Sequence, residues 1–180
     1  QTGAEISSLP QHEHPVECID FSSDGKWLAS GHGSNIRLWK AESGEDVQTL
    51  EGHHDLVTDV AFNTEATQLA SASKDHTIRI WDWPSGALKT TLTGHEDTIN
   101  SVQFSPDGQN IVSASADQTA RIWNLDGELE FKLKSENELI YSACFSPDGR
   151  RVVSAGSPLI GKHGTVKIWD SQTGQLVGAL

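Results

Sequence analysis

The chain has 180 residues and a mass of 19.5 kDa, which is the size of one domain. Its 13 Lys and Arg residues against 25 Asp and Glu residues give a net charge of −12, which argues against nucleic-acid or anionic-membrane binding because both need a basic surface. There is no apolar run of about 20 residues and no signal-peptide pattern, so we expect a cytoplasmic protein. Because Met is absent, we expect a segment of something longer or a chain built for a purpose.

Three residue types recur with a period of about 42 residues. Each repeated Phe is followed nine residues later by a Ser, and four of the six Trp residues lie 42, 42 and 46 residues apart. The members of the three series are Phe21, Phe62, Phe104 and Phe145, then Ser30, Ser71, Ser113 and Ser154, then Trp39, Trp81, Trp123 and Trp169. A shared period in three series indicates an internal repeat.

Each repeat reads as four short strands. In the second repeat, residues 57–62 and 77–81 alternate apolar and polar side chains, residues 69–73 form a small-residue strand between them, and residues 87–92 form a fourth strand. A four-residue turn such as Ser105-Pro-Asp-Gly108 follows the first strand, because Pro and Gly suit a type I turn. No segment shows a helical period. The sequence therefore predicts an all-β protein.

The chain resembles the WD40 repeat β-propellers. The residues that carry the resemblance are the Gly-His pairs at His53 and His95 and the Trp-Asp pairs at Trp81 and Trp169. It implies blades of four antiparallel strands, in which each unit supplies the outer strand of one blade and three inner strands of the next. We expect one domain over residues 1–180, with repeats at about 10–51, 52–93, 94–134 and 135–180 and an extra outer strand near 4–9.

Two repeats contain a Ser, a His and an Asp that together suggest a hydrolase triad. We favour a structural hydrogen-bonded network instead, because buried polar groups need partners and because the set occurs twice, which a catalytic site does not require. The resemblance implies the same network. Its members are His53, Ser71, Asp75 and Trp81 in repeat two, and His95, Ser113, Asp117 and Trp123 in repeat three.

Repeats one and four depart from this set. Repeat one has His12, Ser30 and Trp39 but no Asp, which we attribute to drift. Repeat four has Glu136 at the His position and five extra residues within 156–164, which we interpret as a binding loop.

The loops that carry the network residues are predicted to form an acidic face. We expect Glu13, Asp55, Glu96, Asp97, Glu136 and Glu138 to be exposed there, against Lys74 and Lys162. The face therefore favours a basic protein or peptide and not a phosphopeptide. Together with His163, Trp27 and Trp83, the residues Asp55, Lys74, Glu96, Asp97, Glu138 and Lys162 are the candidate partner-binding residues.

Trp27 and Trp83 lie outside the periodic series. Two interpretations remain open for them: exposed hot spots for a partner, or tryptophans packed flat on their own hairpins.

The predicted function is a non-catalytic scaffold for protein–protein interactions, with no cofactor, no metal site and no catalytic residue. One alternative is a structural fragment that self-assembles, because the outer-strand pattern occurs five times against four sets of inner strands. Two copies would then form a closed eight-bladed ring, or the chain would be part of a longer repeat array. An enzyme on a propeller scaffold is the less favoured alternative.

Overall fold

The computed structural model describes residues 15–158 and 163–180. This part of the chain contains sixteen strands and no helix, so it also contains no helix that could cross a membrane. The all-β prediction is confirmed. The strands are β1 (Val16–Phe21), β2 (Trp27–His32), β3 (Asn35–Lys40), β4 (Asp46–Leu50), β5 (Val57–Phe62), β6 (Gln68–Ser73), β7 (Ile78–Asp82), β8 (Ala87–Leu92), β9 (Ile99–Phe104), β10 (Asn110–Ser115), β11 (Thr119–Asn124), β12 (Leu129–Lys134), β13 (Glu138–Phe145), β14 (Arg151–Pro158), β15 (Thr165–Asp170) and β16 (Leu176–Ala179).

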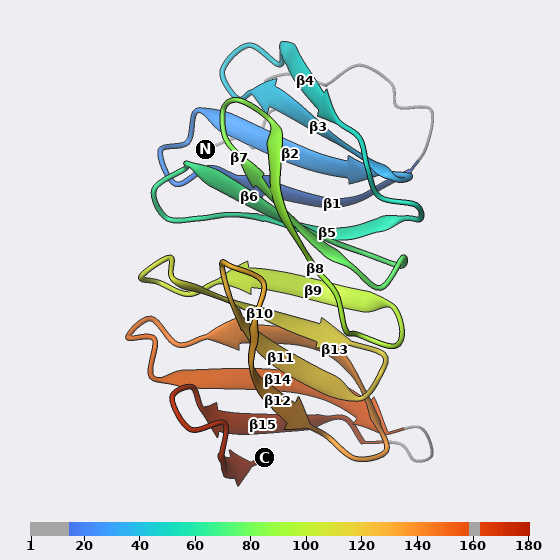
Figure 1. The fold of residues 1–180 in the computed structure, drawn as a ribbon, viewed down its shortest axis with the longest axis vertical. Helices are drawn as coiled ribbons and strands as arrows, with labels where there is room; N and C mark the ends of the chain where they lie inside the picture. The colour runs from blue at the N-terminus through green and yellow to red at the C-terminus, as the bar shows by residue number, and fades with distance from the viewer. Residues whose placement is uncertain (1–14, 159–162) are drawn as a thin grey trace, which may run out of the picture.

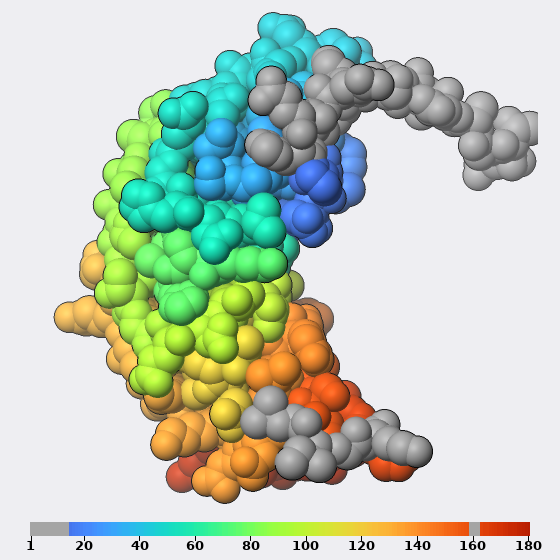
Figure 2. Space-filling view, turned by 90° about the vertical axis from the view of Figure 1, so that its right-hand side faces the viewer, coloured from blue at the N-terminus to red at the C-terminus, as the bar shows by residue number. Residues whose placement is uncertain are grey.

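Every four consecutive strands form one antiparallel sheet, which we call a blade. Blade one is β1–β4, blade two β5–β8, blade three β9–β12 and blade four β13–β16. The blades are stacked in chain order (Figure 1), and seen from the side they form an open crescent (Figure 2). The first strands of the blades lie side by side, β1 against β5, β5 against β9, and β9 against β13. The predicted extra strand near 4–9 falls outside the described residues.

The hydrophobic core lies between the blades. Three clusters of buried side chains fill the joints between blades one and two, two and three, and three and four. At the second joint, for example, Ile78 and Ile80 of blade two pack with Val102 and Phe104 of blade three. Blades two and three therefore bury apolar side chains against a neighbour on both faces, and blades one and four do so on one face.

The turns after β1, β5, β9 and β13 share one conformation. In each, the backbone N–H of the fourth residue donates to the carbonyl of the first, as from Gly108 to Ser105 at 2.9 Å. The fourth residue has a positive φ in every copy, and Ala66 stands with a φ of 53° where the other three turns have Gly. We call the side that carries these turns the hairpin face. It is formed by the connections after the first strands, 22–26, 63–67, 105–109 and 146–150, and by those after the third strands, 41–45, 83–86, 125–128 and 171–175.

The strand pair that opens blade four is longer than its counterparts. Strands β13 and β14 have eight residues each, whereas the matching strands of the other blades have six. Part of the segment 156–164 that we predicted as a loop therefore continues β14 as far as Pro158, which pairs with Glu138. Residues 159–162 are outside the described part of the chain.

Candidate functional site: the loop face

The side of the molecule opposite the hairpin face carries the loops 51–56, 74–77, 93–98, 116–118 and 135–137 between strands. We call this side the loop face. Its loops come from blades two, three and four, and they include the predicted network positions and most of the predicted partner-binding positions.

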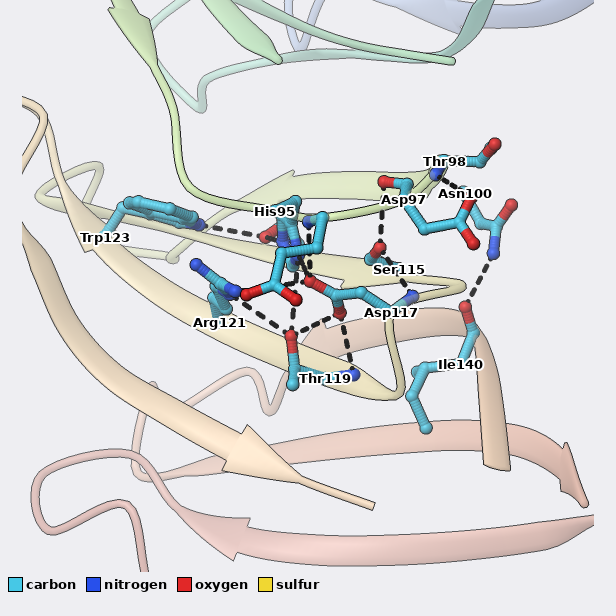
Figure 3. Close-up of polar contacts among 12 residues, drawn as sticks. His95, Asp97, Thr98, Asn100, Ser115, Asp117, Thr119, Arg121, Trp123 and Ile140 are labelled. Carbon is cyan, nitrogen blue, oxygen red and sulfur yellow. Dashed lines mark hydrogen bonds and ion pairs between the residues drawn. The ribbon is translucent and has the colours of Figure 1, made fainter. Parts of the chain in front are cut away.

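Blade three brings its four predicted network residues together. Three of them, His95, Asp117 and Trp123, are labelled in Figure 3. The His95 Nδ1 lies 2.7 Å from an Asp117 carboxylate oxygen, and the His95 Nε2 lies 2.8 Å from the Ser113 hydroxyl. The Trp123 indole N–H donates to the same hydroxyl over 2.9 Å. A chain of polar contacts therefore runs from the loop before β9, through β10, to the buried Trp on β11.

Blade two repeats this geometry almost unchanged. The two contacts of His53, to Asp75 and to the Ser71 hydroxyl, are both 2.8 Å, and the Trp81 indole N–H donates to Ser71 over 2.9 Å. Because two blades contain the same network with matching distances, the network is a structural feature of the repeat rather than a single reactive centre.

The Ser hydroxyls of these networks are not placed to attack a substrate. Ser71 and Ser113 are completely buried, and each hydroxyl already contacts a His and a Trp. A nucleophile needs an approach path for the reacting atom, which burial removes. Burial also raises the pKa of the Cys18 thiol to about 12, with Asp59 adding to the effect, so this thiol is a poor nucleophile.

The network carboxylates are held in their charged form. Burial by itself raises the pKa of Asp117, but the hydrogen bonds from His95 and Thr119 outweigh it and hold that pKa well below its usual range. The pKa of Asp75 is lowered in the same way, against its burial, by His53 and Thr77. Burial lowers the pKa of His95, although Asp117 opposes this.

Sequence reasoning missed several members of the networks. Thr77 and Thr119 each donate from the hydroxyl to the network Asp over 2.6 Å. In blade three, the buried Arg121 forms an ion pair with Asp117 at 3.2 Å. Ser73 and Ser115 each donate to a carbonyl of the loop before the first strand, at Asp55 and Asp97 respectively. Both the Thr pair and the Ser pair are spaced by 42 residues, so the same repeat test could have found them.

Blade four replaces the network with a different polar cluster. The Lys167 ammonium on β15 lies 2.7 Å from a Glu138 carboxylate oxygen and also donates to Ser135, and Ser135 donates to Glu138. Glu138 is 8% exposed. Our prediction that Glu138 is an exposed partner-binding residue is therefore wrong, because the longer β13 takes it into the sheet and Lys167 pairs with its charge.

Blade one retains the last part of the network. The Trp39 indole N–H donates to Ser30 over 2.8 Å, as the Trp169 indole does to Ser154 in blade four over 2.9 Å. His12 and Glu13 lie outside the described residues.

Several predicted partner-binding residues are exposed on the loop face. They are Asp55, Lys74, Glu96 and Asp97, and Glu136 is exposed beside them; His163, which precedes β15, is also exposed. Lys162 lies outside the described residues. Beside the loop 135–137, a depression of about 330 Å³ in blade three is lined by residues that include Gln118, Lys134, Glu136 and Asn137.

The two aperiodic tryptophans lie together near the hairpin face. The ring centroids of Trp27 and Trp83 are 5.0 Å apart in an edge-to-face arrangement, and Trp83 also meets Phe62 at 6.4 Å. Trp83 is 7% exposed and Trp27 is half-buried. Of the two interpretations, exposure is wrong for Trp83, because its ring packs against Trp27 across the joint between blades one and two.

No group of three or more His, Cys, Asp and Glu side chains suited to a metal ion occurs within residues 15–158 and 163–180. Cys18 and Cys144 are both free thiols.

Four antiparallel blades arranged in an arc, with polar ties under the loops of one face, define a segment like that of a β-propeller. The family model described as "WD domain, G-beta repeat" matches residues 3–40, 44–82, 86–124 and 127–170. The chain belongs to this WD40 family. Each of the last three matches begins at or near the outer strand of one blade and ends at the third strand of the next.

Curated relatives share short segments with the chain. The Arabidopsis thaliana "Transcriptional corepressor LEUNIG_HOMOLOG" is 40% identical over 74 residues, which is 41% of this chain and 9% of the relative. The Homo sapiens "U3 small nucleolar RNA-interacting protein 2" is 44% identical over 63 residues, 34% of this chain and 13% of the relative. The Xenopus tropicalis "WD repeat-containing protein 1" is 38% identical over 74 residues, 39% of this chain and 12% of the relative. The matched segments thus cover about a tenth of these proteins.

Proposed function

We propose that the chain is a non-catalytic scaffold that binds a basic protein segment on its loop face. The observation that carries the proposal is the set of exposed carboxylates on loops that buried networks hold in place. Asp55, Glu96, Asp97 and Glu136 are exposed there, with Lys74 as the exposed cation on the same loops of the described chain.

The networks supply the rigidity that a binding surface needs. The backbone N–H of Glu96 donates to Asp117, and that of His54 donates to Asp75, so the loops are tied through their backbones directly beside the exposed acidic side chains. A loop whose backbone is already ordered loses less conformational entropy when it binds, which favours affinity.

Charge favours a basic partner. Exposed carboxylates attract Lys and Arg side chains and repel anions, and this effect acts mainly on the association rate and is screened by salt. The human relative is named for an interaction with an RNA, but a chain with a net charge of −12 does not suit that ligand. The depression beside Glu136 gives room for one side chain of a bound segment.

The test is binding of a fluorescent oligolysine peptide to the full chain, followed by anisotropy at low and high salt. The double variant Asp55→Lys/Glu96→Lys should weaken binding about tenfold. The control Glu65→Lys/Asp126→Lys changes the net charge equally but at exposed sites on the hairpin face, and it should weaken binding less than about threefold. Equal losses would mean that only the net charge matters, and they would overturn the proposal, as would tighter binding of an oligoglutamate peptide.

A further inference from the structure

The two ends of the crescent expose apolar side chains that are buried at every internal joint. On blade one, Val16, Ile19 and Phe21 of β1 are 41%, 63% and 56% exposed. The residues at the same positions of blades two, three and four are at most 9% exposed, because each packs against the preceding blade. We call Val16, Ile19 and Phe21 the head face.

Blade four shows the complementary pattern on its other side. Leu180 is 86% exposed, whereas Leu50, Leu92 and Leu133 at its position in the other blades are at most 3% exposed. Val153 and Ile168 are half-buried, although Val112 and Ile122 at the same positions of blade three are completely buried against blade four. We call Val153, Ile168 and Leu180 the tail face.

Hydrogen bonds between a side chain and a backbone N–H also cross the joints between blades. A side chain of one first strand accepts an N–H from the first strand of the next blade: Asp59 from Val102 at 2.9 Å, and Ser101 from Ala143 at 3.1 Å. Ser142 occupies the matching position in blade four and is exposed. Ile19 occupies the position of Val102 and Ala143 in blade one.

We propose that the head face of one copy of this chain docks on the tail face of a second copy, and that two copies close into one eight-bladed ring. The chain carries both halves of a joint that it already forms three times internally, so the end faces continue an established interface. Phe21 of the second copy takes the place that Phe62, Phe104 and Phe145 take at the internal joints, and the Ser142 hydroxyl accepts the N–H of its Ile19.

Two copies that make this head-to-tail contact at both ends form a closed ring. A head-to-tail contact is heterologous, so it produces either a closed ring or an open filament. The two ends of the crescent are apart and open toward the same side (Figure 2), so a second crescent can meet both at once. Eight blades lie within the range of roughly four to eight that propellers use. Closure also removes two apolar faces from water.

The first measurement is the particle mass of the full chain by light scattering. The expected result is twice the 19.5 kDa chain mass. Phe21→Glu and Leu180→Glu should each give the single-chain mass, because each places a charge in both joints of the ring. Leu88→Glu is the matched control: Leu88 is 45% exposed, much like Leu129 and Leu176 at the same position of other blades, so its exposure does not depend on a missing neighbour.

Mixing the two end variants tests the head-to-tail arrangement. A Phe21→Glu copy keeps its tail face and a Leu180→Glu copy keeps its head face, so the mixture forms one intact joint and should recover part of the doubled mass. Neither variant should recover it alone. Both altered residues are exposed in the single chain, and circular dichroism checks that the variants are folded.

Three outcomes would overturn the proposal. The first is a wild-type chain that stays at the single-chain mass, which would leave a further blade of a longer polypeptide as the occupant of the end faces. The second is a series of growing oligomers, which would indicate an open filament. The third is a Leu88→Glu variant that dissociates as readily as Phe21→Glu.

Discussion

Blades three and four solve one packing problem with different side chains. In blade three, the loop before the first strand is tied to the third strand through His95 and Asp117, and Asp117 also pairs with the buried Arg121. In blade four, Glu138 and Ser135 tie the corresponding segment to Lys167, which stands at the position of Arg121. The comparison shows that blades three and four each pair a cation on the third strand with a carboxylate and tie down the loop before the first strand, but with different residues.

The largest expected effect comes from removing the carboxylate of blade three. Asp117→Ala leaves the 4% exposed Arg121 without its ion pair and removes the 2.7 Å contact of the His95 Nδ1, and it should lower the free energy of unfolding by about 3–5 kcal/mol. Asp75→Ala in blade two should cost about 2 kcal/mol, because the described residues show no ion pair between Asp75 and Arg79.

Urea unfolding of both variants measures this difference. Wild-type urea m-values in both variants would show that the change lies in stability alone. Equal losses for Asp117→Ala and Asp75→Ala would contradict the role given to Arg121.

A double-mutant cycle on Glu138 and Lys167 tests whether blade four uses its ion pair in the same way. Glu138→Ala alone should cost about 2 kcal/mol, because it leaves a largely buried ammonium with the Ser135 hydroxyl but without its counter-charge. Adding Lys167→Met should recover part of the loss, which gives a coupling energy of about 1–2 kcal/mol.

The control cycle is the exposed pair of Lys40 and Glu45, which has a similar distance of 2.8 Å. Its coupling energy should not exceed about 0.5 kcal/mol, because an exposed ion pair is screened by water. If the two coupling energies agree, then Glu138 and Lys167 do not form a structural tie.

The periodic residues made the architecture predictable, and the aperiodic ones did not. The Trp, Phe and Ser series were sufficient to predict four blades, because a repeated side chain occupies a repeated environment. Glu138 was wrongly predicted to be exposed, because the number of extra residues does not distinguish a longer hairpin from a longer loop. Trp83 was misplaced because its partner, Trp27, is an aperiodic residue of another blade.

The exposure of residues at the ends of the crescent could not be predicted from the repeat pattern either. Phe21 and Phe62 belong to one series, yet Phe21 is 56% exposed and Phe62 is 9% exposed. Periodicity predicts which face of a strand is apolar, whereas burial depends on the neighbour that covers it.

The smallest expected effect is on the pH dependence of stability. Its sign differs between the carboxylates of the blade networks and a carboxylate at a joint between blades. Asp75 and Asp117 have lowered pKa values, so the stability that they contribute is present at neutral pH and is lost as the pH falls below about 4. Asp59, at the joint between blades two and three, is different: burial raises its pKa to about 6, although the N–H groups of Val102 and Val60 oppose the shift and the nearby Asp20 adds to it.

Because the folded-state pKa of Asp59 lies above its unfolded value, its contribution is full at low pH and is lost as the pH rises through about 6. We therefore expect the wild-type chain to lose about 1–2 kcal/mol from this group between pH 4.5 and pH 7.5, and Asp59→Asn to lack that part of the decline. Urea unfolding at both pH values measures the two slopes. Asp107→Asn is the control, since the hydrogen bond from Ser105 lowers the pKa of Asp107 and places its titration below this range. An unchanged slope in Asp59→Asn would show that the Asp59 carboxylate does not lose stability when it ionises at this joint.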